Sequence, residues 1–318
     1  MEHLDREINR LVNNSVAKST HKAYRRSVEK FIIFRRKFGM GNNWPATSKQ
    51  VAAFIANLSL EGLAASSICV QISGISFVHK INGWTDPSDN FLVHKLKEGC
   101  RRQNRGSDAR CPMTIPMLRR VAQVLQAICQ NFYEAALFKA AFLLAFFGFL
   151  RVGEMTKTPN VEVTHIVSVR DVQLKLGTQR KLSVCIRFSK KDQNGQGEII
   201  ELQKGVLVDL CPVEAMDKFL KIRPKIEGPL FIHFNSKPMT SGQFTAVLRK
   251  ALTVIGLNPA NFSGAQFRIG AMTTAAARGI SMEVIKEMGR WRSQSVRTYI
   301  RPTRTIQVPL MEETGSEM

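Results

Sequence analysis

The chain has 318 residues, of which 44% are hydrophobic, so it can form two domains that each bury a core, and it is too apolar to be disordered. Its 46 Lys and Arg residues outnumber 25 Asp and Glu residues, and the net charge of +21 predicts a polyanionic partner, nucleic acid first. The apolar run 140–150 is shorter than the roughly 20 residues that span a bilayer, which favours a soluble, intracellular protein.

The charge is spread over both parts of the chain. Residues 1–112 hold 18 basic and 9 acidic residues, a balance of +9, and the remainder holds 28 and 16, a balance of +12. Two basic parts are expected if they clamp a DNA duplex between them. The six cysteines have no paired spacing, so we expect free thiols in a reducing compartment and no metal site.

Helical patterns fill the N-terminal third of the chain. Residues 2–13 have helical spacing, Ser19 and Thr20 are predicted to cap a stronger helix, and further helices are predicted from Ser48, over 65–81 and over 90–102. We therefore predict a small helical DNA-binding domain over residues 1–100. The second helix carries an excess of one charge sign that favours phosphate contact over a merely solvated face, and its candidate residues are Arg25, Arg26, Arg35, Arg36 and Lys37.

A basic stretch without periodicity follows at 101–112, and it includes Arg101, Arg102 and Arg105. It is predicted to be an interdomain linker that lies along the phosphate backbone. A nuclear-import signal is a compatible alternative.

The remaining residues, 113–318, predict a mainly α domain with a small antiparallel sheet. Helices are expected over 115–128, with Thr114 as cap, over the apolar run 133–147 that must lie in a core, and over 212–222, 241–255 and from 264 onward. Strands are expected over 163–169, 182–188 and 198–202, and the last two form a hairpin whose turn carries Lys190 and Lys191.

Three motifs in this domain carry chemistry. Arg151 lies in Gly148-Phe-Leu-Arg-Val-Gly-Glu154, where Glu154 can orient it, and a structural salt bridge is the alternative. Arg268 lies in the first turn of an alanine-rich helix that Gly279 closes. A guanidinium binds phosphate oxygens in a planar fork.

The third motif follows that helix. Tyr299 comes two helical turns after Trp291 and is flanked by Arg297 and Arg301. A phenol in such basic surroundings can attack phosphorus, and a buried structural tyrosine is the alternative.

These motifs, in this order, resemble the C-terminal signature of tyrosine recombinases of the phage-integrase type. The sequence motifs F-R-I-G-A, G-R-W and T-Y-I-R are similar to those of recombinases of eukaryotic mobile elements such as DIRS-like retrotransposons and Cryptons. The resemblance implies a SAM-like core-binding domain over 1–100, a catalytic domain over 113–318, and site-specific recombination of double-stranded DNA through a 3′-phosphotyrosyl bond.

The family also implies a role for each site residue. Tyr299 would be the nucleophile, Arg151 and Arg268 would bind the phosphate, and Lys190 would be the general acid, with Lys191 as an alternative. The indole N–H of Trp291 would donate a hydrogen bond to a non-bridging oxygen of the phosphate. DNA contacts are expected from Arg297 as well as from the basic residues above, and neither a metal nor another cofactor is expected.

The resemblance further implies a homodimer on one DNA site and a homotetramer in the synapse. The apolar tail 306–311 is expected to reach a neighbouring subunit. The protein is predicted to belong to a mobile element and to act in the nucleus.

One position departs from the family pattern. The family has H-x-x-R ahead of this helix, and here Ala265 stands in the histidine position. Three explanations are open: weakened activity, replacement of the histidine by Gln266 or water, or a deliberate substitution that traps a DNA complex, which the other intact positions favour. A DNA-binding protein without turnover and a type IB topoisomerase are the alternative functions.

Overall fold

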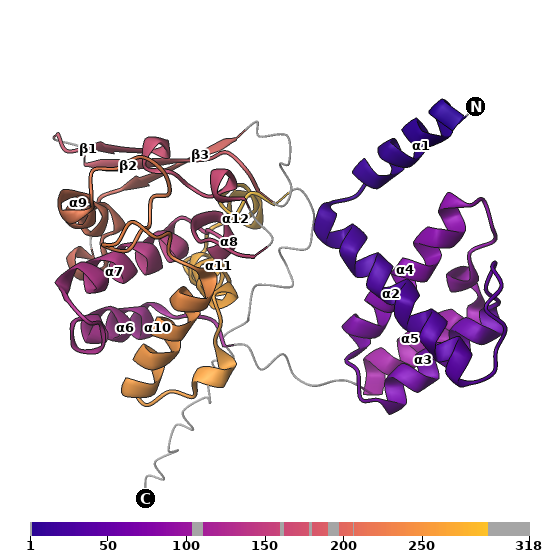
Figure 1. Cartoon of the computed structure of the whole chain (residues 1–318). Coiled ribbons are helices and arrows are strands. Elements are labelled where there is room, and N and C mark those ends of the chain that lie inside the picture. The colour runs from indigo at the N-terminus through magenta and orange to yellow at the C-terminus, as the bar shows by residue number, and fades with distance from the viewer. Residues whose placement is uncertain are drawn as a thin grey trace, which may run out of the picture. The chain divides into compact units, whose positions relative to one another are not determined.

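The computed structural model describes residues 2–103, 111–159, 162–177, 180–189, 197–205 and 207–291. The chain divides into two compact units, unit 1 over 1–108 and unit 2 over 109–318 (Figure 1). Several expected site residues and the expected tail lie outside the described residues: Arg105, Lys190, Lys191, Arg297, Tyr299 and 306–311.

The described residues of unit 1, 2–103, form helices joined by loops and include no strand. Its helices are α1 (Glu2–Asn14), α2 (Lys18–Lys37), α3 (Ser48–Leu60), α4 (Ala65–Ile81) and α5 (Phe91–Gln103), with a short 3-10 turn, η1 (Pro87–Asp89), before α5. Helices α2 and α4 are in contact, with the rings of Tyr24 and Phe77 4.9 Å apart. Phe31, Phe54 and Ile68 are fully buried in the core of the unit.

Two expected boundaries in unit 1 are wrong by a few residues. Helix α2 begins at Lys18 after Ala17, which makes no side-chain cap, so Ser19 and Thr20 lie inside the helix. Helix α5 continues to Gln103, so Arg101 and Arg102 are helical and do not begin an extended linker. The helix predicted over 90–102 therefore ends within one residue of α5, and only the overlapping start of the expected linker at Arg101 is wrong.

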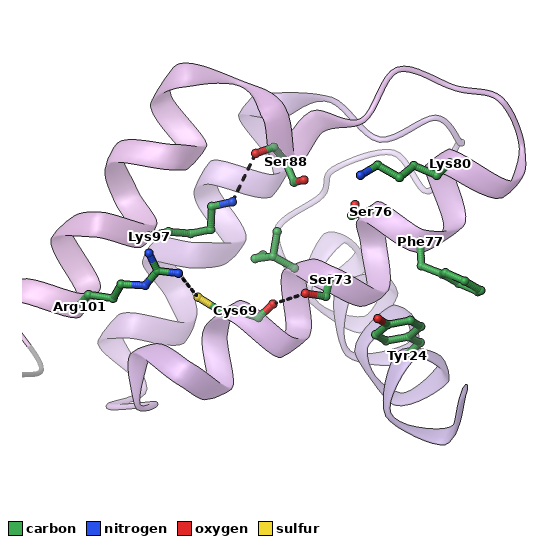
Figure 2. Close-up of a pocket in the computed structure, with 10 residues that line it drawn as sticks. Tyr24, Cys69, Ser73, Ser76, Phe77, Lys80, Ser88, Lys97 and Arg101 are labelled. Atoms are coloured by element: carbon green, nitrogen blue, oxygen red, sulfur yellow. Dashed lines mark hydrogen bonds between the residues drawn. The ribbon is translucent and has the colours of Figure 1, made fainter. Parts of the chain in front are cut away.

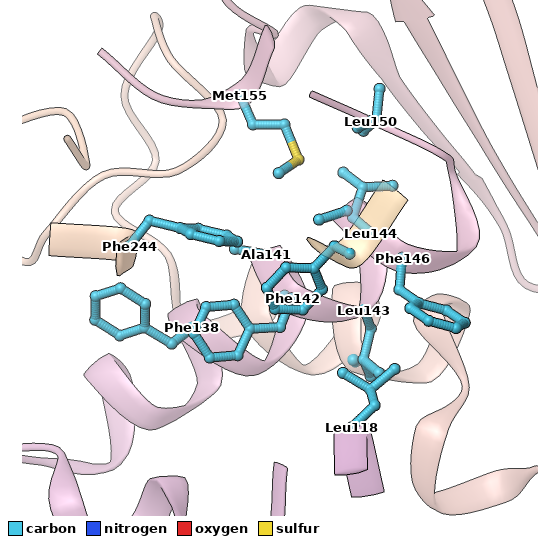
Figure 3. Close-up of a cluster of buried hydrophobic side chains, with 14 of the residues drawn as sticks. Leu118, Phe138, Ala141, Phe142, Leu143, Leu144, Phe146, Leu150, Met155 and Phe244 are labelled. Atoms are coloured by element: carbon cyan, nitrogen blue, oxygen red, sulfur yellow. The ribbon is translucent and has the colours of Figure 1, made fainter. Parts of the chain in front are cut away.

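Unit 2 is built around the apolar helix α7 (Phe132–Phe147), as expected. Ten of its residues are buried, and Phe142 packs edge-on against Phe244 of α10 (Ser241–Val254) with ring centroids 4.8 Å apart (Figure 3). Helix α6 (Ile115–Ile128) lies against α7 and is capped by Thr114, whose side chain accepts a hydrogen bond from the Met117 amide. Helix α9 (Pro212–Ile222) also contacts α7.

A three-stranded antiparallel sheet covers part of this core, in the order β1 (Val172–Lys175), β2 (Lys181–Ile186) and β3 (Glu198–Gln203). Leu182, Val184 and Ile186 of the central strand alternate toward the buried side. Ile186 pairs with Glu198, so the expected antiparallel pairing of these two strands is present, and the expected turn residues Lys190 and Lys191 lie outside the described residues.

The expected strand over 163–169 is wrong. The structure has 3-10 turns there, η2 (Val163–His165) and η3 (Val169–Asp171), and the first strand starts at Val172. The backbone of this segment makes hydrogen bonds outside the sheet. The Val167 amide donates to the Glu154 carbonyl, and the Leu230 amide donates to the Val167 carbonyl. Tertiary contacts therefore override a local β pattern.

The remaining described elements of unit 2 are three helices and two 3-10 turns. They are α8 (Val152–Met155), α11 (Ala265–Ala277) and α12 (Met282–Met288), with 3-10 turns η4 (Val208–Leu210) and η5 (Pro259–Asn261). Gly279 follows α11 with a φ of +77°, as its expected role in ending that helix requires. Across the described part of the chain, no helix has the length and apolar character needed to cross a membrane.

Candidate active site

A tight turn after the core helix α7 positions Arg151. Phe149 has a left-handed backbone, with a φ of +52°, and the Leu150 amide donates back to the Ala145 carbonyl over 3.1 Å. A non-glycine residue in this region costs about 1 kcal/mol. Phe149 is 5% exposed, so burial of its ring offsets this cost and the chain leaves the core directly at Arg151.

Glu154 makes the expected contact with Arg151. Its Oε1 accepts from Arg151 Nη1 over 2.8 Å, and its Oε2 accepts from the Arg151 backbone amide over 2.9 Å. The Glu154 side chain is 5% exposed and that of Arg151 is 30% exposed. The carboxylate thus orients the guanidinium and leaves part of it open to a ligand.

Arg268 and Trp291 form the second part of the site. The Arg268 guanidinium carbon lies 3.8 Å from the centroid of the Trp291 ring, and its Nη2 donates to the Gly289 carbonyl. Both residues are buried. Stacking on the indole holds the cation where a lysine could not replace its planar group.

The two parts of the site are neighbours because α8 and α11 meet. A Cβ added at Gly264, just before α11, would lie 2.3 Å from a Val152 methyl, so only glycine permits this approach. A Cβ at Gly289 would lie 1.8 Å from the Trp291 ring, so glycine is needed there as well. Arg151, Glu154, Arg268 and Trp291 are therefore gathered around the segment 289–291.

Arg290 is a member of this site that the sequence analysis did not single out. Its Nη2 donates to Glu154 Oε2 over 2.7 Å, and its side chain is 7% exposed. Its position inside G-R-W was the available signal. From the sequence alone, an arginine between a glycine and a tryptophan is expected to be a surface cation, because the turn that buries it is not evident there.

Ala265 is the first residue of α11 and is exposed. The neighbouring Gln266 is buried, and its Oε1 accepts from the amide and the hydroxyl of Ser263, each over 2.7 Å. Its Nε2 donates to the Asn261 carbonyl over 3.2 Å. The Gln266 amide is committed to this turn, which argues against Gln266 as the substitute for the histidine.

Arg35 corrects the expected DNA-binding set in unit 1. Its side chain is fully buried, and it donates to the carbonyls of Asn43 and Asn42 over 2.8 and 3.1 Å. Its guanidinium lies over the rings of Phe31 and Trp44, and burial lowers its pKa from the ordinary value. Arg35 closes the loop after α2 and has no surface left for DNA.

The other described candidates of unit 1 are on its surface. Those on α2 are Arg25, Arg26, Arg36 and Lys37, and those on α5 are Arg101 and Arg102. Arg25 pairs with Glu29 over 3.4 Å and Arg102 pairs with Glu98, and such exposed pairs contribute little energy. These side chains can exchange a carboxylate for a phosphate at small cost.

A pocket of about 380 Å³ lies between α4 and α5, lined by Lys80, Lys97 and Arg101 (Figure 2). Lys97 Nζ donates to the Ser88 carbonyl over 3.4 Å, and Arg101 Nη2 lies 3.7 Å from Cys69 Sγ. Arg101 was expected to bind DNA, whereas the sequence analysis did not single out Lys80 and Lys97, which line the same pocket. The spacing of Lys97 and Arg101, one helical turn apart, was the signal for a shared face.

Comparisons with known proteins now bear on this arrangement. No family model matches the chain. Over 308 residues it is 24% identical to an integrase/recombinase, a XerD homologue of Selenomonas ruminantium, covering 93% of this chain and 84% of that protein.

Solved structures share the fold. A lambda integrase dimer bound to a COC′ core site matches with a TM-score of 0.62 at 17% identity, covering 95% of each chain. A variant Tn1549 transposon integrase in complex with a circular intermediate DNA also has a TM-score of 0.62, at 15% identity, covering 92% of this chain and 93% of that one. The XerH site-specific recombinase bound to a palindromic difH substrate gives 0.60 at 12% identity, with 86% and 73% covered.

The expected fold, helical with a small antiparallel sheet, is confirmed. These relatives do not test the finer likeness to recombinases of eukaryotic mobile elements, which stays a prediction. In its motifs, in its sequence over nearly the whole length and in its fold, the chain resembles the tyrosine recombinases.

Proposed function

We propose that the protein is a site-specific DNA recombinase that cleaves and rejoins DNA through a 3′-phosphotyrosyl intermediate on Tyr299. The observation that carries the proposal is the segment 289–291, which contacts Arg268 directly and Arg151 through Glu154. Two guanidiniums in one site are the charge complement of a phosphodiester. They occur here in the fold of enzymes that resemble the chain over most of its length.

The chemistry follows from the charges. The Tyr299 hydroxyl gives its proton to water as its oxygen attacks phosphorus, the bond to the 5′ oxygen breaks, and that oxygen takes a proton from Lys190. Negative charge grows on the non-bridging oxygens, where Arg151 and Arg268 stabilise the transition state more than the ground state. Rejoining is the reverse reaction: a 5′ hydroxyl attacks phosphorus and gives its proton to the lysine, and the displaced tyrosine oxygen takes a proton from water.

The proposal extends to partners and setting. Double-stranded DNA is bound by both basic units, a homodimer forms on one site, and a homotetramer forms in the synapse with the tail 306–311 passed between subunits. Integration or excision of a mobile element in a nucleus is the proposed role. The lambda integrase structure is itself described as a dimer on a core site, which supports the first of these assemblies.

The test is covalent capture of DNA. The protein is incubated with DNA carrying candidate terminal repeats, and a denaturing gel is expected to show a protein–DNA adduct. Tyr299→Phe is expected to bind the same DNA and to give no adduct. An adduct that persists in this variant would place the nucleophile elsewhere, and relaxation of a plasmid without a specific site would indicate a topoisomerase instead.

A second function, DNA binding without turnover, is favoured by two observations. Ala265 offers no imidazole for proton transfer, and the Arg268 guanidinium is already engaged by the Gly289 carbonyl and the Trp291 ring. If this second function is correct, the unchanged protein and the Ala265→His variant should both bind DNA tightly and form no adduct.

A further inference from the structure

Three consecutive residues, Gly289, Arg290 and Trp291, each hold a charged group of the candidate site. The Gly289 carbonyl accepts from Arg268, and the Trp291 ring stacks on the same guanidinium. Arg290 instead contacts Glu154, which holds Arg151. We propose that Arg290 is a positioning residue that fixes Arg151 through Glu154, and this inference rests on the proposed phosphoryl transfer.

The contacts of Glu154 show how the effect would be transmitted. Oε2 accepts from Arg290 over 2.7 Å and from the Arg151 amide over 2.9 Å, and Oε1 accepts from the Arg151 guanidinium over 2.8 Å. Arg290 and Glu154 are 7% and 5% exposed, whereas Arg151 is 30% exposed. Two charge-assisted bonds in a buried place leave the carboxylate one orientation, and that orientation sets the direction of Arg151.

The backbone of Arg290 indicates that its side chain is needed. Its φ is +56°, a left-handed conformation that glycine adopts freely and that costs other residues about 1 kcal/mol. Its Nη1 is also buried and has no hydrogen-bond partner within the described part of the chain. A strained backbone and a buried cation without all its hydrogen bonds both cost free energy, so packing alone does not account for an arginine at this position. Such strain is concentrated at functional sites.

Arg290 also reaches the base of the β2–β3 hairpin. Its Nε lies 3.6 Å from Oε2 of Glu198, the first residue of β3. The connection that precedes Glu198 contains Lys190, which lies outside the described residues. Arg290 therefore links the carboxylate behind Arg151 to the strand that follows the expected general acid.

The first test separates rate from affinity. Arg290→Gly removes the side chain and suits the left-handed turn, so we expect an intact fold, checked by thermal unfolding. At saturating DNA, the rate of adduct formation should fall by about 10- to 100-fold, the scale of losses for groups that orient a reacting residue. The Kd for DNA should stay nearly unchanged. Arg290→Lys should recover part of the rate, and Arg278→Gly, which removes an exposed arginine of the same unit, should change neither value.

A double variant tests whether Arg290 acts through Glu154. If it does, Glu154→Gln combined with Arg290→Gly should be no slower than Glu154→Gln alone, because the second change removes a link that is already broken. Multiplicative losses would overturn the proposal. So would an unchanged rate in Arg290→Gly, or a rate loss matched by an equal loss of DNA affinity.

A third readout does not depend on activity. Phenylglyoxal modifies accessible guanidiniums, and peptide mass mapping reports the modification of Arg151. In Arg290→Gly the modification of Arg151 should be severalfold faster, with exposed Arg170 as the internal reference. If no adduct forms in any variant and Arg151 still becomes more reactive, phosphoryl transfer fails and the positioning role stands; unchanged reactivity overturns the positioning role.

Discussion

Adjacent arginines of α2 lie in opposite environments. Arg35 is fully buried over Phe31 and Trp44, whereas Arg36 is exposed. The periodicity held the clue, because Arg35 follows Phe31 by one helical turn and therefore shares its buried face. Charge counting alone placed both arginines on the DNA-binding surface; this is wrong for Arg35 and stays a prediction for Arg36.

We predict that Arg35→Ala destabilises unit 1 without weakening DNA contact in the folded protein. The change removes the hydrogen bonds to the Asn43 and Asn42 carbonyls and leaves a gap between aromatic rings in the core, for which losses of about 2–4 kcal/mol are typical. Urea unfolding measures the loss. Arg36→Ala is the matched control, with nearly unchanged stability and a salt slope of DNA binding lower by about 1. Equal effects of the two variants on DNA affinity would contradict this division.

Ala265 gives the second prediction at this scale. It is exposed at the start of α11, so a histidine fits there without displacing the core. If the rest of the site is competent, Ala265→His should raise DNA cleavage by about 10²–10⁴-fold, the usual contribution of a general acid–base group. Ala277→His, at the exposed last residue of the same helix, should change nothing. No gain in Ala265→His would mean that water already serves this role or that the site is inactive for another reason.

At the scale of elements, Asp86 joins α4 to the turn before α5. Its carboxylate accepts from the Ser76 hydroxyl over 2.5 Å and from the Ser88 amide over 2.8 Å, and Lys80 Nζ lies 3.1 Å away. Burial alone would raise the pKa of Asp86, but the bonds from Ser76, Ser88 and Lys80 outweigh it and lower the pKa from 3.8 to about 2. The ionised form therefore stabilises this connection.

The sign of this shift fixes a pH dependence. Because the folded pKa is depressed, the stabilisation is complete above the unfolded value of 3.8 and is lost as the pH falls toward 2. Asp86→Asn should be less stable than the parent protein at pH 6, and the difference should shrink between pH 4 and about 2. Unfolding followed by the fluorescence of Trp44 and Trp84 measures it. The exposed Asp89→Asn serves as control, and a gap that stays constant with pH would refute the assignment.

Elements defined by strong periodicity were predictable, and those decided by distant contacts were not. Helix α9 has the predicted bounds, and α7 starts one residue before the predicted Tyr133, because apolar side chains repeat along both. Residues 163–169 have an equally good β pattern, but Ser168 makes only an isolated antiparallel bridge to Pro229 and the segment joins no sheet. Their amides and carbonyls bind the backbone of Glu154, Gly228 and Leu230, which no local pattern specifies.

For the whole molecule, sequence order predicted the fold class and named three residues that the structure brings together, but not the contacts that gather them. Arg151, Arg268 and Trp291 could be named from their motifs. The role of Arg290 depends on a positive φ and on the meeting of α8 with α11, and both are properties of the folded chain. The compact units divide at residue 108, which lies within the stretch 101–112 that was expected to be a linker from its composition.

Charge gives the prediction that belongs to the whole molecule. Residues 1–112 carry +9 and the remainder carries +12, so DNA held by both units should neutralise on the order of ten phosphates. Affinity should then fall by about 10³–10⁵ between 50 and 200 mM salt, because bound counterions are released on binding. Fluorescence anisotropy with one DNA duplex at several salt concentrations gives the slope. Removal of residues 1–112 should lower both the affinity and the slope, since phosphate contacts leave with them. If the shortened chain keeps the full slope, unit 2 makes all the phosphate contacts and the two units do not clamp the duplex.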